Sequence, residues 1–270
     1  MYIDVNGHAI YAYTGGKAPN PGQPTAILIH GVLCDHSIWA LQSRYLANHG
    51  WNVLAIDLPG HCRSQGPAPA SVEEAARCIA ALMDAAGLEK AALVGHSWGS
   101  LIALQAAADL GARVSHLALV GIAHPMKVSP MLLESALNTP DKAIEMVNTF
   151  SRATLSPPGG AGSWVFGAGM ALGRRVLASN AQQNLLHTGF LACDRYTGGE
   201  AAIAAITCPV LFALGAQDQM TPPKAAQGLL QAAQAAGKRV ERVLLPMGHN
   251  QTTESPDETL FALRDFLQAA

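Results

Sequence analysis

The chain carries little charge and few aromatic side chains. Charged residues make up 13% of its 270 residues and aromatic residues 6%, whereas 50% are hydrophobic. The formal net charge is −2, so no basic excess favours binding to nucleic acid or to an anionic membrane surface. A chain of this length and composition is expected to bury a large core in one domain, with room for an inserted subdomain.

Cysteines and long apolar runs are also scarce. The cysteines are an odd number without paired spacing, which argues against a disulfide framework or a zinc site: Cys34, Cys62, Cys78, Cys193 and Cys208. The N-terminal residues lack the basic and apolar regions of a signal peptide, and no uninterrupted apolar stretch reaches the roughly 18 residues of a membrane span. We therefore expect a cytoplasmic protein with reduced thiols.

Hydrophobic patterning predicts strands and helices that alternate along the chain, which is typical of a doubly wound, mostly parallel α/β sheet. Asn6-Gly7 is a hairpin signal between the first two strands. The predicted strands lie at 2–5, 9–13, 26–29, 52–56, 91–94, 117–120, 209–214 and 239–245. The predicted helices of this alternation lie at 38–48, 72–86, 99–109, 223–236 and 256–268.

Residues 123–205 interrupt the alternation with helical pieces and without a convincing strand. We expect residues 1–122 and 206–270 to form one core and 123–205 to form a helical cap above the strand ends, where parallel sheets bind ligands. The glycine-rich stretch 159–173 suggests that the cap moves as a lid.

A G-x-S-x-G pentapeptide, Gly-His-Ser-Trp-Gly, occupies residues 95–99 between an apolar strand and an alanine-rich helix. On a sharp strand-to-helix turn, Ser97 would present its Oγ at the top of the sheet. Taken alone, Ser97 would be interpreted as a helix N-cap. The strand before it and the helix after it favour a nucleophile.

A serine nucleophile needs a base, and the base needs an acid to orient it. His249 follows the last predicted strand and Asp218 follows the strand before it, in the order Ser, Asp, His. Each has a plainer interpretation, as a loop histidine or a turn residue. We interpret His30 and His96 as structural residues that support the site.

An oxyanion intermediate needs two hydrogen-bond donors. The backbone N–H of Trp98 directly follows the nucleophile and supplies one. The second is expected from Val32, because His30-Gly31 ends a buried strand and lets the chain turn back over the site.

Five motifs in this order resemble those of α/β-hydrolases of the capped, single-domain esterase kind, over nearly the whole chain. They are His30-Gly31, residues 57–64, residues 95–99, residues 215–218 and Gly248-His249. The resemblance implies Ser97 as nucleophile, Asp218 as acid and His249 as base, with neither a metal nor an organic cofactor. The chain departs from the family at Cys62, where a loop suited to left-handed glycine has gained a Cβ.

The expected activity is hydrolysis of carboxylic esters through an acyl-enzyme, with a small-molecule substrate of small to medium, largely apolar acyl or aryl type. Leu33, Trp164 and Phe166 are the predicted pocket residues. Three alternatives stay open: a proline iminopeptidase-like peptidase, a lactonase or carbon–carbon bond hydrolase with the same triad, and a non-catalytic binding protein on a hydrolase fold. Neither the natural substrate nor the oligomeric state follows from the sequence.

Overall fold

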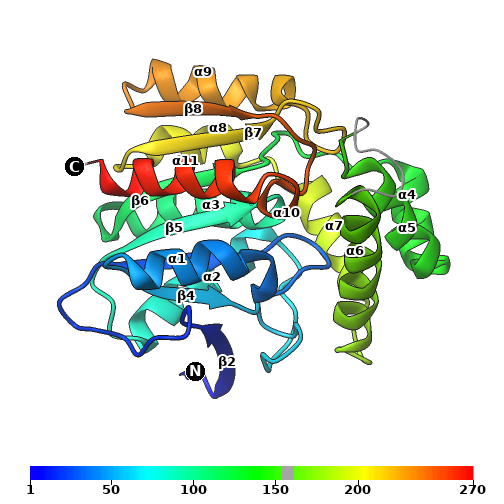
Figure 1. Cartoon of the computed structure of the whole chain (residues 1–270), viewed down its shortest axis with the longest axis horizontal. Helices are drawn as coiled ribbons and strands as arrows, with labels where there is room; N and C mark the ends of the chain where they lie inside the picture. The colour runs from blue at the N-terminus through cyan, green and yellow to red at the C-terminus, as the bar shows by residue number, and fades with distance from the viewer. Residues whose placement is uncertain (154–160, 270) are drawn as a thin grey trace.

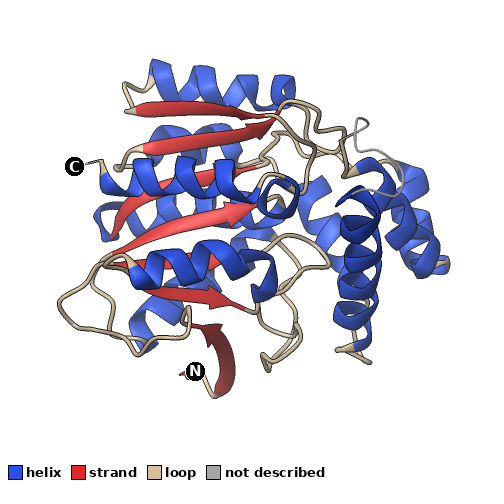
Figure 2. Ribbon diagram, viewed as in Figure 1, coloured by secondary structure: helices blue, strands red, loops and turns tan. Residues whose placement is uncertain are grey.

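A sheet of eight strands, with helices on both of its faces, forms the body of the molecule (Figure 1, Figure 2). This computed structural model describes residues 1–153 and 161–269, and the side chains of residues 161–165 lie outside that description. The strand order is β1-β2-β4-β3-β5-β6-β7-β8. The strands are β1 (Tyr2–Val5), β2 (His8–Tyr13), β3 (Thr25–Ile29), β4 (Asn52–Ile56), β5 (Ala91–His96), β6 (Val114–Val120), β7 (Val210–Gly215) and β8 (Val240–Leu245).

The first two strands form a hairpin, and the remaining strands run parallel to one another. Asn6 and Gly7 both have positive φ angles, 54° and 82°, as a two-residue hairpin turn of this kind requires. From β4 to β8 every pairing is parallel. Strands β3, β5 and β7 are buried at every residue, because helices cover both faces of the sheet. The predicted doubly wound, mostly parallel sheet is confirmed.

Two apolar layers hold the helices against the sheet. Helices α1 (Ala40–Asn48) and α11 (Pro256–Gln268) share one hydrophobic cluster with one face. The other face packs against α2 (Val72–Ala85), α3 (Trp98–Leu110), α8 (Gly199–Ala205) and α9 (Gln227–Ala235). The short elements are η1 (His36–Trp39), η2 (Gly111–Arg113), η3 (Pro223–Ala226) and α10 (Gln251–Glu254). Among the described helices, none has the length and apolar character needed to cross a membrane.

Helices inserted between β6 and β7 lie beyond the tips of the strand arrows (Figure 2). They are α4 (Pro130–Asn138), α5 (Pro140–Phe150), α6 (Ala161–Ala178) and α7 (Leu185–Arg195), and they share a third apolar cluster. Helix α8, at the end of the same insertion, packs instead against α3 and α9 beside the sheet. We call α4–α7 the cap helices below.

Two glycines of α6 allow this helix to approach α5 closely. A Cβ on Gly169 would lie 1.8 Å from Oδ1 of Asn148, and one on Gly173 would lie 2.9 Å from Cγ2 of Ile144. Gly167 faces open space. Two glycines on which the lid expectation rested therefore have a packing role, and residues 159 and 160 lie outside the described part of the chain.

We expect Gly169→Ala to lower the free energy of unfolding by about 1–3 kcal/mol, because the added methyl group collides with the buried amide of Asn148. Gly167→Ala, on the same helix, is the matched control. It should raise stability by up to about 1 kcal/mol, because alanine favours the helix and meets no neighbour. Urea unfolding of both variants tests this, and equal effects would contradict the packing role of Gly169.

Candidate active site

Ser97 occupies the turn between β5 and α3 with a strained backbone. Its φ of 55° and ψ of −120° are rarely adopted by residues other than glycine. The turn is tight, since a Cβ on Gly95 would lie 2.0 Å from the carbonyl oxygen of Gly99. A Cβ on Gly99 would in turn lie 2.3 Å from the carbonyl oxygen of Ile29. Both glycines are therefore required for the strand, the helix and β3 to meet beneath Ser97.

The structure brings together the three residues that the sequence assigned to a triad. Oγ of Ser97 lies 2.9 Å from Nε2 of His249, and Nδ1 of His249 lies 2.8 Å from Oδ2 of Asp218. Asp218 follows β7 and His249 follows β8, so neighbouring parallel strands deliver both side chains to one edge of the sheet. This geometry allows His249 to accept the hydroxyl proton of Ser97.

The carboxylate of Asp218 is buried and surrounded by donors. Its Oδ1 accepts the backbone N–H groups of Met220 and Thr221, at 2.9 and 2.7 Å. The Thr221 hydroxyl lies 2.7 Å from Oδ2. Burial alone would raise the pKa of Asp218, but the neighbouring His249 and these hydrogen bonds outweigh it and lower the pKa to about 2. Asp218 is therefore ionised at neutral pH.

His96 and Gln251 form a second buried layer behind these residues. Nε2 of His96 donates to the carbonyl oxygen of His249 at 2.8 Å and lies 3.1 Å from Oε1 of Gln251. The Gln251 amide then donates to Oδ2 of Asp218 at 3.2 Å. Sequence reasoning missed Gln251 and Thr221. The Asp-x-x-Thr spacing was a signal for Thr221, whereas nothing local marks Gln251 as buried.

The loop after β3 lies against Ser97. A Cβ on Gly31 would be 3.1 Å from Cβ of Ser97, so only glycine fits without displacement. His30 is fully buried and its Nε2 accepts the N–H of Leu58 at 3.1 Å, which joins this loop to the one after β4. Burial lowers the pKa of His30. Val32, which follows Gly31, packs its side chain against α7 at Gly189.

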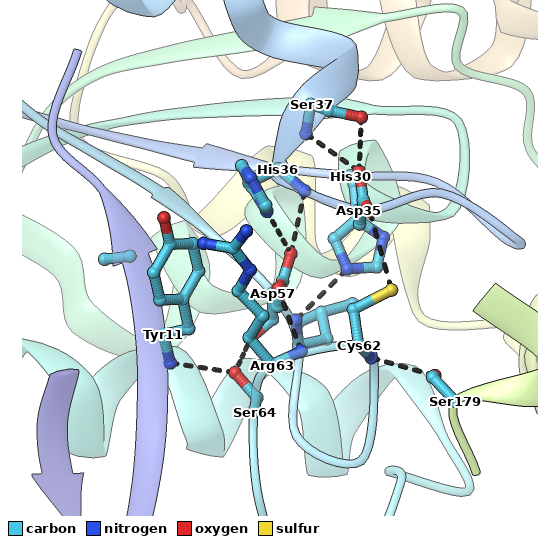
Figure 3. A network of polar contacts seen from close by, with 12 residues as sticks. Tyr11, His30, Asp35, His36, Ser37, Asp57, Cys62, Arg63, Ser64 and Ser179 are labelled. Atoms are coloured by element: carbon cyan, nitrogen blue, oxygen red, sulfur yellow. Dashed lines mark hydrogen bonds and ion pairs between the residues drawn. The ribbon is translucent and has the colours of Figure 1, made fainter. Parts of the chain in front are cut away.

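The loop after β4 is organised around the buried carboxylate of Asp57 (Figure 3). Its Oδ1 accepts the backbone N–H of His36 at 2.9 Å, and its Oδ2 accepts that of Arg63 at 3.2 Å. Cys62 adopts a φ of 45°, in the left-handed region that favours glycine. Its N–H donates to Oγ of Ser179 on the cap side, at 3.0 Å, so this strained position also contacts the insertion.

Asp35, His36 and Asp57 could each offer one metal-binding atom, and these atoms lie within 4.8 Å of one another. Nδ1 of His36 lies 2.8 Å from Oδ1 of Asp57, and Arg175 pairs with Asp35 at 2.5 Å. Because protein groups already pair with these atoms, the set acts as a structural network. Beside it, burial and the nearby Asp35 raise the pKa of the Cys62 thiol to about 12, which keeps the thiol protonated.

A cavity of about 730 Å³ opens beside Ser97 and His249, between the core and the cap helices. Of the predicted pocket residues, Leu33 lines it, and so does Val32, the predicted oxyanion-hole residue. Phe166 does not, because its ring lies beneath the guanidinium of Arg152, 5.0 Å away. The side chain of Trp164 lies outside the described residues. Much of the cap wall consists of small or apolar residues: Val147, Ala168, Gly169, Ala171, Leu172, Gly173 and Phe190.

Stability should fall as the pH drops below about 7, because His96 must stay neutral in the folded state. Burial and the neighbouring His249 lower the pKa of His96 to about 4, whereas an unfolded histidine titrates near 6.5. As the pH falls, the unfolded chain therefore binds the proton first. The free energy of unfolding drops by roughly 1.4 kcal/mol for each pH unit below 6.5. We expect His96→Gln to remove about 2 kcal/mol of the loss between pH 7 and pH 5. Urea unfolding at both pH values measures it, with His8→Gln on the exposed hairpin as control.

Several proteins of known sequence are similar to this chain over part or most of its length. Residues 24–153 match a family model described as the alpha/beta hydrolase fold. A protein provisionally named carbamate hydrolase RutD, from Klebsiella pneumoniae, is 29% identical over 83% of this chain and 84% of its own length. A dihydrolipoyllysine-residue acetyltransferase component of an acetoin cleaving system, from Cupriavidus necator, is 38% identical over 122 residues. That match covers 44% of this chain and only 31% of the acetyltransferase component.

Solved structures share the whole architecture. An enol-lactonase from Burkholderia xenovorans has a TM-score of 0.79 at 22% identity, over 99% of both chains. An esterase from Exiguobacterium antarcticum has a TM-score of 0.82 at 18% identity, also over 99% of both chains. At these identities the likeness shows the fold alone. With the family model over residues 24–153 and the observed sheet order, it shows that the chain has the α/β-hydrolase fold.

Proposed function

We propose that this protein is a serine hydrolase that cleaves carboxylic esters of small to medium, largely apolar substrates. The observation that carries the proposal is the continuous hydrogen-bonded chain from Ser97 through His249 to Asp218, with Ser97 and His249 lining the cavity. A strained nucleophile, a base within hydrogen-bonding distance and an ionised acid are the parts that acyl transfer needs.

In this mechanism His249 takes the proton of Ser97 while Oγ attacks the ester carbonyl. The backbone N–H groups of Val32 and Trp98 stabilise the oxyanion, and loss of one such donor typically costs about 3 kcal/mol in the barrier. His249 then gives its proton to the leaving alcohol. Water, activated by His249, cleaves the acyl-enzyme and releases the acid, which restores Ser97.

The lining of the cavity supports an uncharged acyl group. Residues of α5, α6 and α7 present short or apolar side chains toward the space beside Ser97. Arg175 also lines the cavity, but the buried carboxylate of Asp35 pairs with it and offsets its charge. The cap helices thus act as the substrate-selecting part of the molecule.

A peptidase that holds a substrate amine would need cap carboxylates facing the nucleophile. Among the described residues that line the cavity there is no Asp or Glu. Two of the cap acids are instead paired elsewhere, Asp141 with Arg174 and Asp194 with Lys127. This lining favours an ester over an aminoacyl-proline substrate.

We expect the wild type to hydrolyse p-nitrophenyl esters and Ser97→Ala to lose activity by a factor on the order of 10⁴ or more, because the nucleophile is removed. Ser115→Ala is the matched control and should retain full activity, because Ser115 lies at the start of β6, at the end of the strand away from the site. Parallel assays with a lactone and a carbamate identify the carbonyl that is preferred. A wild type that turns over none of them, and that a fluorophosphonate does not label, would refute the proposal.

The acyl-length optimum should depend on Ala171, which lines the cavity without filling it. We expect Ala171→Phe to shorten the preferred acyl chain and to lower kcat/KM for long esters by about 10-fold or more, because each excluded CH₂ forfeits about 0.8 kcal/mol of burial. Ala178→Phe, on the exposed end of the same helix, is the control. An unchanged chain-length profile in Ala171→Phe would show that the acyl group binds elsewhere.

A further inference from the structure

The end of α5 contacts the loop that carries His249 through main-chain atoms. The N–H of His249 donates to the carbonyl oxygen of Ser151 at 2.6 Å. Close beside this bond, one carboxylate oxygen of Glu254, Oε2, accepts the N–H of Ala153 at 3.0 Å and that of Gly248 at 3.3 Å. Glu254 therefore joins a residue of the insertion to the residue that precedes the base.

This contact is too close for any residue but glycine at position 248. A Cβ on Gly248 would lie 2.6 Å from both the backbone nitrogen of Ala153 and the carbonyl oxygen of Ser151. Ser151 and Ala153 are themselves buried, with 2% and 5% of their surfaces exposed. The two segments thus touch over main-chain atoms, and the Glu254 carboxylate holds the contact closed.

The opposite end of the cap is also fastened to the core. Asn180, after α6, donates to the carbonyl oxygen of Gly60 at 3.1 Å. Gln183 accepts the N–H of Ala68 at 2.7 Å. The insertion is therefore held to the core at two places, of which the contact at residues 151–153 is the one that reaches the His249 loop.

We propose that Glu254 is a positioning residue that couples the cap helices to the catalytic base. Resting on the proposed function, this assigns Glu254 no contact with the substrate. It fixes the backbone of Gly248 against Ala153, and so fixes the point from which the His249 ring reaches Ser97. A displacement of about 1 Å in such a group can cost 10²-fold in rate.

The test compares Glu254→Met, which keeps the volume and removes the acceptors, with Glu254→Gln, whose amide oxygen can accept both N–H groups. Glu254→Met should lower kcat for the best ester by about 10- to 100-fold, with KM changed less than about twofold. Glu254→Gln should stay within about threefold of the wild type. Glu258→Ala, at an exposed acid four residues along the chain, is the control and should match the wild type.

Hydrogen exchange of the peptide 246–253 supplies a measurement that does not depend on activity. In Glu254→Met its amides should exchange at least about 10-fold faster, while those of β5 stay unchanged. If the wild type hydrolyses nothing, the proposed function fails, and the exchange data alone still decide the coupling. If Glu254→Met does not fold, Gly248→Ala replaces it, because its added methyl group separates the same segments and should give the same kcat loss. Normal kcat and normal exchange in folded Glu254→Met, or in Gly248→Ala where it replaces that variant, would overturn the inference.

Discussion

The buried charge of Asp218 requires hydrogen-bond donors, and the surrounding residues of the site are placed to supply them. A carboxylate removed from water is destabilised unless donors replace its hydration. Here the donors come from three places: the turn after β7 at Met220 and Thr221, the loop after β8 at His249, and α10 at Gln251. Together these donors replace the hydration that the carboxylate loses on burial. The charge that binds His249 therefore also links two neighbouring strand ends and a short helix.

The fold was predictable because its signals are local. Central strands such as β3 and β5 appear as continuous apolar runs since helices cover both faces, and the Asn6-Gly7 turn has a specific backbone requirement. The proximity of Ser97, Asp218 and His249 followed from the same logic. Parallel strands end at one edge, so residues just after them converge whatever their separation in the chain.

The rest of the site depends on packing between distant segments, which no local pattern encodes. Gln251 lies in the core because Gly121 and Gly215 leave room for its amide, with hypothetical Cβ atoms 3.0 Å from it. Phe166 was expected in the pocket on hydrophobicity alone, yet it packs under Arg152. The glycines of α6 indicated mobility by composition, whereas Gly169 and Gly173 provide contact with α5. A residue type indicates which roles a position can have, and the neighbouring residues in the fold determine which of these roles it takes.

The contacts that hold the cap helices to the core rely largely on main-chain groups. Ser151 O, Ala153 N, Gly60 O, Cys62 N and Ala68 N all take part. In four of these contacts the other partner is a side chain, that of Glu254, Asn180, Ser179 or Gln183, and none of these is among the described residues that line the cavity. Residues that line the cavity, such as Ala171, can therefore vary while His249 stays aligned with Ser97. A few positions in this arrangement accept few other residues. At Gly248 the neighbouring main chain is too close for a Cβ, and at Cys62 the backbone has a positive φ.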